Sequence, residues 1–197
     1  MEKKYELTDE VKTLENGRVL YRIRALKDFE LKNGAEVHAG DVGGWVEKED
    51  NLSQDGNCWV YDDACVFENS RVFGNACVHE AACVFGNSRA YDDACIFGNS
   101  RVFGNCLVHD AARVYDDAWI FENSRVFGNA CVHDAAWIFG NACVHEAACV
   151  FGNACVHEAA CVFGNSRVFG NACVHDAARI FGNACVHGDA VVHDDKS

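Results

Sequence analysis

An unbroken period of six residues is the feature that most constrains this chain of 197 residues. Twenty-three consecutive hexapeptides run from Gly56 to His193 without an insertion or a deletion. The fifth position is Val, Ile or, once, Ala, and the third position is Ala, Ser or Cys. This alternation does not match the 3.6-residue period of a helix. It predicts a short strand over positions three to six, with positions three and five facing inward, followed by a corner at positions one and two.

Three hexapeptides close a triangular coil of 18 residues, so residues 56–193 are predicted to form about 7.7 coils of an all-β, parallel β-helix. Each strand should pair in register with its copy 18 residues away. Val60, Val78 and Val108 are expected inside the coil, and Phe67 and Cys77 outside it. At the corners, Gly and Asn are expected to adopt the left-handed backbone conformation.

The first 55 residues lack this period. Residues 18–26 are predicted to form a strand, 33–34 a turn, and 41–46 a glycine-rich connection into the first coil. Because the end of a solenoid exposes its core and unpaired strand edges, residues 1–55 are interpreted as a small N-terminal β cap. Residues 194–197 are interpreted as a charged tail.

The repeat, together with the segments Gly43-Gly44-Trp45 and Gly56-Asn57-Cys58-Trp59, resembles the hexapeptide-repeat superfamily of left-handed, single-stranded β-helices. Within it, the chain is most similar to uncharacterised bacterial and phage proteins with repeats of the GNARVYGDARV type, some of which are labelled acyltransferases from their fold alone. The resemblance covers 56–193. The chain departs from the usual pattern by carrying Cys where Arg is commoner and Phe or His where Tyr is commoner.

The resemblance implies acyl transfer from acyl-CoA or acyl-ACP as one activity, with a His general base for which His109, His133 or His145 would be candidates. Such enzymes usually interrupt their coils with a protruding loop and add a C-terminal helix, and this repeat has neither. The cross-subunit zinc pattern of γ-class carbonic anhydrases cannot be matched residue by residue. No catalytic residue is therefore predicted.

Charge and composition exclude several other functions. The net charge is −13, and residues 56–197 hold 17 acidic and only 8 basic residues, so binding to nucleic acid through phosphate contacts is not expected. The N-terminus has no apolar signal segment, and no window approaches the roughly 18 apolar residues of a membrane span. We expect a cytoplasmic protein without membrane contact or cofactor, whose thirteen cysteines remain thiols.

One predicted face of the solenoid is rich in aromatic residues. Its outward side chains at position six are Phe67, Phe85, Phe103, Phe121, Phe139, His157, His175 and His193, and those at position four include Trp119 and Trp137. Stacked rings stabilise neighbouring strands by roughly 0.2–1 kcal/mol per pair, which is one explanation for them. However, seven outward aromatic side chains would exceed the apolar patch that a monomer usually exposes. We therefore expect the Phe and Trp residues to form a binding surface, most simply for a second copy of the chain, and otherwise for an unknown protein partner.

Cysteines and histidines continue the same face. Cys155, His157, Cys173, His175 and His193 are the only cluster for which zinc binding is considered. Histidine occupies position six eight times, so repeat duplication explains these residues and no metal is expected. Five cysteine pairs are predicted on adjacent coils, and an open prism face offers no sheltered base to activate a cysteine.

These observations predict a non-catalytic structural or binding solenoid that presents Cys, Arg and Trp at position four and Phe and His at position six. An acyltransferase-like enzyme and an acidic interaction or inhibitor protein of phage origin are the alternatives. Mimicry of DNA is disfavoured, because the repeat region nets −9 whereas B-DNA of about 37 Å carries about 22 charges.

Overall fold

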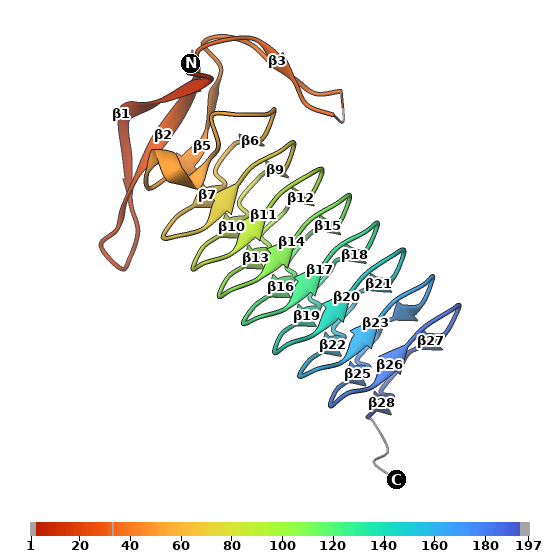
Figure 1. Ribbon diagram of the computed structural model, residues 1–197. Helices are drawn as coiled ribbons and strands as arrows, with labels where there is room; N and C mark the ends of the chain where they lie inside the picture. Colours follow the sequence, from red (N-terminus) through yellow and green to blue (C-terminus); the bar gives the residue numbers. More distant parts are fainter. Residues whose placement is uncertain (1–2, 33, 194–197) are drawn as a thin grey trace.

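The computed structural model describes residues 3–32 and 34–193. Figure 1 shows a stack of coils that runs from a cap at the N-terminal end to the last strand, β28. The predicted tail, 194–197, lies outside the described residues. In the part of the chain that the structure describes, no helix is long and apolar enough to cross a membrane.

The solenoid consists of 23 two-residue strands arranged in three parallel sheets, each of which forms one face. The first face contains β7 (Cys65–Val66), β10 (Cys83–Val84), β13 (Arg101–Val102), β16 (Trp119–Ile120), β19 (Trp137–Ile138), β22 (Cys155–Val156), β25 (Cys173–Val174) and β28 (Val191–Val192). The second face contains β8 (Arg71–Val72), β11 (Arg89–Ala90), β14 (Leu107–Val108), β17 (Arg125–Val126), β20 (Cys143–Val144), β23 (Cys161–Val162) and β26 (Arg179–Ile180). The third face contains β6 (Trp59–Val60), β9 (Cys77–Val78), β12 (Cys95–Ile96), β15 (Arg113–Val114), β18 (Cys131–Val132), β21 (Cys149–Val150), β24 (Arg167–Val168) and β27 (Cys185–Val186).

Each strand pairs in register with the strand one coil later, as Cys83 of β10 does with Arg101 of β13. The predicted all-β, three-sided parallel β-helix is confirmed. The strands are shorter than predicted, because only positions four and five are regular strand. Position three belongs to the corner, where its N–H turns back to the carbonyl of the preceding position six, as Ala64 does to Tyr61 over 3.1 Å.

The backbone of the corners differs from the prediction in one respect. Position one, not Asn at position two, takes the left-handed conformation, and its occupants include eleven Asp or Glu residues with φ between 50° and 64°. This conformation costs an L-residue about 1–2 kcal/mol. Several of these carboxylates accept the backbone N–H of position one in the next coil, as Asp110 does from Gly128 over 3.0 Å and Glu158 from Asp176 over 3.0 Å. A hydrogen bond to a charged acceptor offsets much of the cost.

Asparagine at position two has a different role. The side-chain amides of Asn69, Asn87, Asn105 and Asn123 form a ladder in which each Nδ2 donates to the next Oδ1 over 3.0–3.2 Å. This ladder ties successive corners together along the edge of the first face.

The core is the continuous column of side chains from positions three and five. Val60, Val78 and Val108 are fully buried, which confirms their predicted inward orientation. Burial decreases only at the C-terminal end, where Ile180 is 7% exposed and Val186 9% exposed. The column thus has one covered end and one more open end among the described residues.

The cap joins the first face of the solenoid directly. β1 (Tyr5–Thr13) pairs antiparallel with β2 (Val19–Ala25), β2 with β5 (Val42–Val46), and β5 runs parallel to β7. Residues 18–26 were correctly predicted to contain a strand, but residues 41–46, predicted as a connection, contain β5. Gly43 and Gly44 permit this pairing, because a Cβ on either would lie 2.6–2.7 Å from neighbouring side-chain or carbonyl atoms.

The rest of the cap is irregular. β3 (Phe29–Glu30) and β4 (Glu36–Val37) form a small hairpin, and a single 3₁₀ turn, η1, spans Glu49–Asn51. Gly34 donates its N–H to the Leu31 carbonyl in the predicted turn, whereas Asn33 lies outside the described residues.

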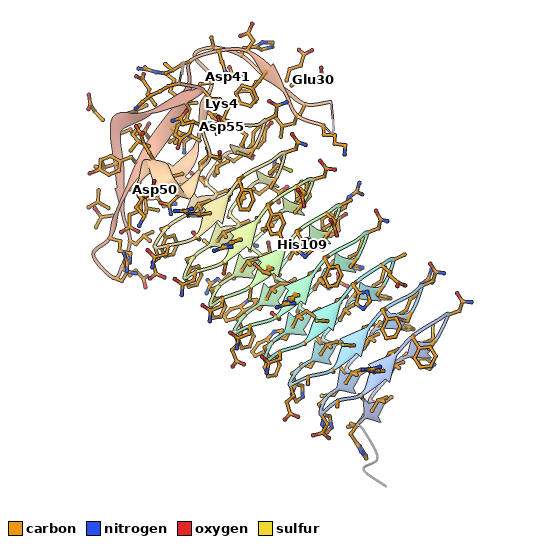
Figure 2. The ribbon with its side chains drawn as sticks, viewed as in Figure 1. Lys4, Glu30, Asp41, Asp50, Asp55 and His109 are labelled. Atoms are coloured by element: carbon orange, nitrogen blue, oxygen red, sulfur yellow. The ribbon has the colours of Figure 1, made fainter. Side chains whose placement is uncertain are left out.

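Polar side chains of the cap donate hydrogen bonds to backbone carbonyls of the first coil of the solenoid; Figure 2 labels one of them, Lys4. Lys4 is fully buried, and its Nζ donates to the carbonyls of Gly56 at 3.2 Å and Cys58 at 2.9 Å. Asn51 donates to the carbonyl of Ser70 over 2.9 Å. Burial lowers the pKa of Lys4 below its ordinary value. The cap therefore supplies hydrogen-bond donors where the solenoid has no preceding coil.

Candidate functional site

The predicted aromatic residues of the first face form a continuous column. We call the outward side of the first face, which contains every third strand from β7 to β28, the aromatic face. Phe67, Phe85, Phe103, Phe121 and Phe139 stack with centroids 4.9–5.2 Å apart and planes within 5° of parallel. His157, His175 and His193 extend the column at separations of 4.7–5.7 Å. The ring spacing follows the spacing of the strands that carry the rings.

A second, shorter column lies beside the first. Trp119 and Trp137 stack 5.5 Å apart, and each contacts a ring of the Phe column edge-on, Trp119 with Phe103 and Trp137 with Phe121, at 6.1 Å. The guanidinium of Arg101 lies 5.0 Å from the Trp119 ring. Trp137 is 43% exposed, whereas Trp119 is half-buried. Four mutually packed aromatic rings therefore occupy the middle of the face.

The exposure of the aromatic face is uneven. Phe67 is only 7% exposed, because it packs with Leu20 and Trp45 of the cap. The other four Phe rings are half-buried, since each is covered by its neighbours in the stack. The surface open to a partner thus begins at Phe85 and is most prominent at Trp137. Its exposed area is smaller than that of seven fully exposed rings, which the sequence pattern indicated.

Ring columns occur on all three faces, although only one was predicted. On the third face, for example, Tyr61, His79 and Phe97 stack at 4.2 and 4.8 Å, and on the second face Tyr91 and His109 stack at 4.8 Å. The signal was available, because position six is aromatic or His in all 23 hexapeptides. Stacking alone therefore does not distinguish the aromatic face; the tryptophan pair does.

The predicted metal cluster is only partly assembled. His157 Nε2 lies 3.3 Å from Cys173 Sγ, and Cys155 is in register with Cys173. Burial raises the pKa of both thiols, with a further contribution from Cys173 at Cys155 and from Glu158 at Cys173. His175 instead approaches Asp176, with its Nδ1 3.1 Å from the carboxylate.

Within residues 3–32 and 34–193, three groups of possible metal ligands do converge, and one of them includes His175 of the predicted cluster. Among the described residues, the groups whose ligand atoms all lie within 4.8 Å of one another contain one His and two carboxylates and no Cys: Asp92/His109/Asp110, Asp116/His133/Asp134 and Glu158/His175/Asp176. The sequence signal is an acidic position one, followed 17 residues later by His and an acidic residue. In each group at least one carboxylate already accepts a backbone N–H of the next coil. The corner hydrogen bonds explain why these groups converge.

The candidate general bases are separated. His109, midway along the solenoid in Figure 2, stacks between Tyr91 and Phe127 on the second face, and its Nδ1 lies 3.4 Å from Asp110. His145 stacks on Phe127 on the same face, without a carboxylate contact of this kind. His133 lies on the third face, 3.3 Å from Asp134. The structure does not bring the three together.

All five predicted cysteine pairs are in register, and all thirteen cysteines are thiols in the structure. The pairs are Cys65/Cys83, Cys77/Cys95, Cys131/Cys149, Cys143/Cys161 and Cys155/Cys173. The prediction that the prism faces are open is wrong for the first pair, because the cap covers Cys65. Cys77 is also buried, beside a pocket of about 280 Å³ lined by Lys32, Cys95 and Arg113.

Two comparisons with known proteins bear on the family. A family model described as the YdcK β-solenoid repeat matches residues 178–194. The Escherichia coli (strain K12) protein named "Uncharacterized acetyltransferase YdcK" is 37% identical over 71 residues, an alignment that covers 32% of this chain and 20% of that protein. The chain thus matches about one fifth of the length of this curated relative. Both matches fit the hexapeptide-repeat β-helix family that the sequence resembles.

Proposed function

We propose that the protein is a structural and binding solenoid, and that two copies associate through the aromatic face. The observation that carries the proposal is the stacked pair Trp119 and Trp137, of which Trp137 is 43% exposed at the centre of the face. Partly exposed Trp at the middle of a flat apolar surface is typical of residues that dominate binding energy in protein interfaces.

A second copy is a suitable partner, because its face has the same ridge spacing. In a two-fold arrangement the same patch serves both copies, so the ring ridges of one copy fit between those of the other along the whole stack. The seven strands of the aromatic face from β10 to β28 span about 34 Å at the usual strand spacing. A width of about 16 Å then gives a buried area of about 550 Å² per copy. The total of about 1,100 Å² is near the lower limit for a specific interface.

Charge at the edges of the face opposes this association. The corners beside β16 and β19 carry Asp116, Asp117 and Asp134 on one edge and Glu122 on the other. Two such faces bring like charges together, and salt screens that repulsion. We therefore expect the dimer to become tighter as ionic strength rises.

The test is the mass of the particle in solution. Trp137→Glu should convert the dimer to a monomer in sedimentation or light scattering, and replacing Phe103, Phe121 and Trp137 together by polar residues should do so more completely. Phe181→Glu is the matched control, because Phe181 is 61% exposed at position six of the second face. The β-sheet circular dichroism should stay intact in every variant. A mass that Trp137→Glu leaves unchanged would rule this interface out.

Acetyl transfer is the second candidate. It is supported by the name of the E. coli relative and by the contacts of His109 with Asp110 and of His133 with Asp134, because a carboxylate that orients an imidazole is part of many general-base arrangements. Calorimetry with acetyl-CoA distinguishes the candidates. Saturable acetyl-CoA binding, with acetyl transfer that His109→Ala or His133→Ala abolishes, would favour the enzyme, whereas the binding solenoid predicts no acetyl-CoA binding.

A further inference from the structure

Cys65 and Cys83 are placed where a disulfide could form. They lie directly opposite each other on β7 and β10 of the first face. Adjacent strands are about 4.8 Å apart, and disulfides bridge Cα atoms separated by about 4.4–6.8 Å. Both residues are thiols in the structure.

The two thiols differ in accessibility. Cys65 is 3% exposed, because it packs against Leu20 of β2 and Trp45 of β5, whereas Cys83 is half-buried and lies at the edge of this cluster. Figure 1 shows the β1–β2 hairpin at the N-terminal end of the face, where β5 joins it to β7 in one sheet. One thiol can therefore meet a small reagent, and the other is shielded behind it.

The charges around the pair favour a thiolate. Lys12 of β1 places its Nζ 3.7 Å from Cys65 Sγ, and Arg101 is in register with Cys83 on the next strand. The adjacent Cys65 thiol, assisted by Arg101 and Lys12 and opposed by burial, lowers the pKa of Cys83 to about 7. The same contact raises the pKa of Cys65 well above its ordinary value.

A distal pair lacks the cap and its lysine. Cys143 and Cys161 of β20 and β23 have the same register on the second face and are both half-buried, but no cap strand covers them. Burial raises the pKa of Cys143. Strand geometry and a neighbouring arginine are common to both pairs, since Arg179 is in register with Cys161 as Arg101 is with Cys83. The features that distinguish the first pair are the cap and Lys12.

We propose that Cys65 and Cys83 form a redox-active dithiol that exchanges with low-molecular-weight disulfides, with Cys83 as the attacking thiolate and Cys65 as the resolving thiol. Cys83 Sγ attacks one sulfur of glutathione disulfide, whose S–S bond breaks and releases one glutathione thiolate. Cys65 then attacks Cys83 Sγ and releases the second glutathione, while the first thiolate takes the Cys65 proton. The pair loses two electrons, and one glutathione disulfide becomes two glutathione molecules.

The test compares the two pairs within one molecule. The reduced full-length chain is mixed with glutathione disulfide at pH 7, quenched with N-ethylmaleimide, and mapped by peptide mass spectrometry. At pH 7 a thiol of pKa about 7 is half ionised, whereas a thiol of ordinary pKa about 8.5 is about 3% ionised. A thiolate of lower pKa is a weaker nucleophile, so the expected ratio of the two reaction rates is only about threefold. The Cys65–Cys83 disulfide should therefore form at least about threefold faster than the Cys143–Cys161 disulfide.

Single variants separate the two roles. Cys65→Ser should accumulate a glutathione adduct on Cys83, because no resolving thiol remains, whereas Cys83→Ser should leave Cys65 unmodified over the same time. Lys12→Met should slow the reaction of the wild-type pair without changing that of Cys143 and Cys161. Circular dichroism checks that each variant is folded. The proposed dimer would cover β10 but not β20 and β23, so the rates are compared in the Trp137→Glu background. Equal rates at the two pairs there, or no adduct on Cys83 when Cys65→Ser is added, would overturn the proposal.

Discussion

A comparison of two buried serines tests the hydrogen bonding inside the coil. Ser70 and Ser88 both occupy position three and are fully buried. The Ser70 hydroxyl lies 2.6 Å from the Phe67 carbonyl and 2.9 Å from the Val84 carbonyl, whereas the Ser88 hydroxyl has no partner in the described structure. Alanine fits both sites, because sixteen of the 23 hexapeptides carry Ala at position three. Replacement by Ala should therefore have opposite effects at the two sites.

The expected magnitudes follow from what each substitution leaves behind. Ser88→Ala removes a buried hydroxyl without a hydrogen bond and should stabilise the chain by about 1–2 kcal/mol. Ser70→Ala removes a hydrogen bond, but the carbonyls of Phe67 and Val84 keep their backbone donors, so no acceptor is left unpaired. The cost should be about 1 kcal/mol.

Thermal unfolding followed by circular dichroism measures the difference. For a chain of this size, 1 kcal/mol corresponds to roughly 2–4 °C in Tm, so the two variants should differ by roughly 4–12 °C, with wild type between them. Ser124→Ala is a further control, because the Ser124 hydroxyl donates to the Phe121 carbonyl over 2.9 Å. If Ser88→Ala lowers Tm as much as Ser70→Ala does, the hydroxyl of Ser88 has a hydrogen-bond partner and the predicted gain in stability is wrong.

Three further predictions concern buried or perturbed ionisable groups. Lys4→Met leaves two carbonyls of the first coil without a donor and should lower the unfolding free energy by about 1–3 kcal/mol in denaturant titrations, and a loss below 0.5 kcal/mol would contradict the role of the lysine. Burial lowers the pKa of His79, so stability should fall as pH drops below about 6.5, and His79→Phe should reduce this loss between pH 8 and 5.5 but not the stability at pH 8. Alkylation of Cys83 by iodoacetamide should rise through about pH 7, since its thiolate persists above that pH and is lost below it; a midpoint above 8.5, as for an ordinary thiol, would count against the pairing with Cys65.

Most of the solenoid could be predicted because one periodicity determines both its local and its long-range contacts. The inward orientation of Val60, the register of Cys65 with Cys83 and the Phe column all follow from the 18-residue coil. Once the 18-residue coil is known, these contacts need no further structural assumption.

The features that escaped prediction depend on contacts that the repeat does not encode. Acidic residues at a left-handed corner are unfavourable locally, and what stabilises Asp110 is a backbone N–H that lies 18 residues away in the sequence, on Gly128. The burial of Phe67 and the position of Lys12 over Cys65 come from the cap, which has no period. A chain segment without internal repetition offers no register from which such contacts could be derived.

Because the coils stack in register, the number of residues before a side chain determines which face it lies on. Removal of 18 residues would shorten the stack and leave every later side chain on its original face. Removal of one hexapeptide, such as residues 140–145, would turn everything after it by a third of a turn. Phe163 and Phe181 would then follow Phe139 in one unbroken phenylalanine column, and His157 would move to another side of the prism. Loss or gain of one hexapeptide can thus move the outward side chains of all later coils to another face. The interior stays intact, because positions three and five carry the same residue types on every face.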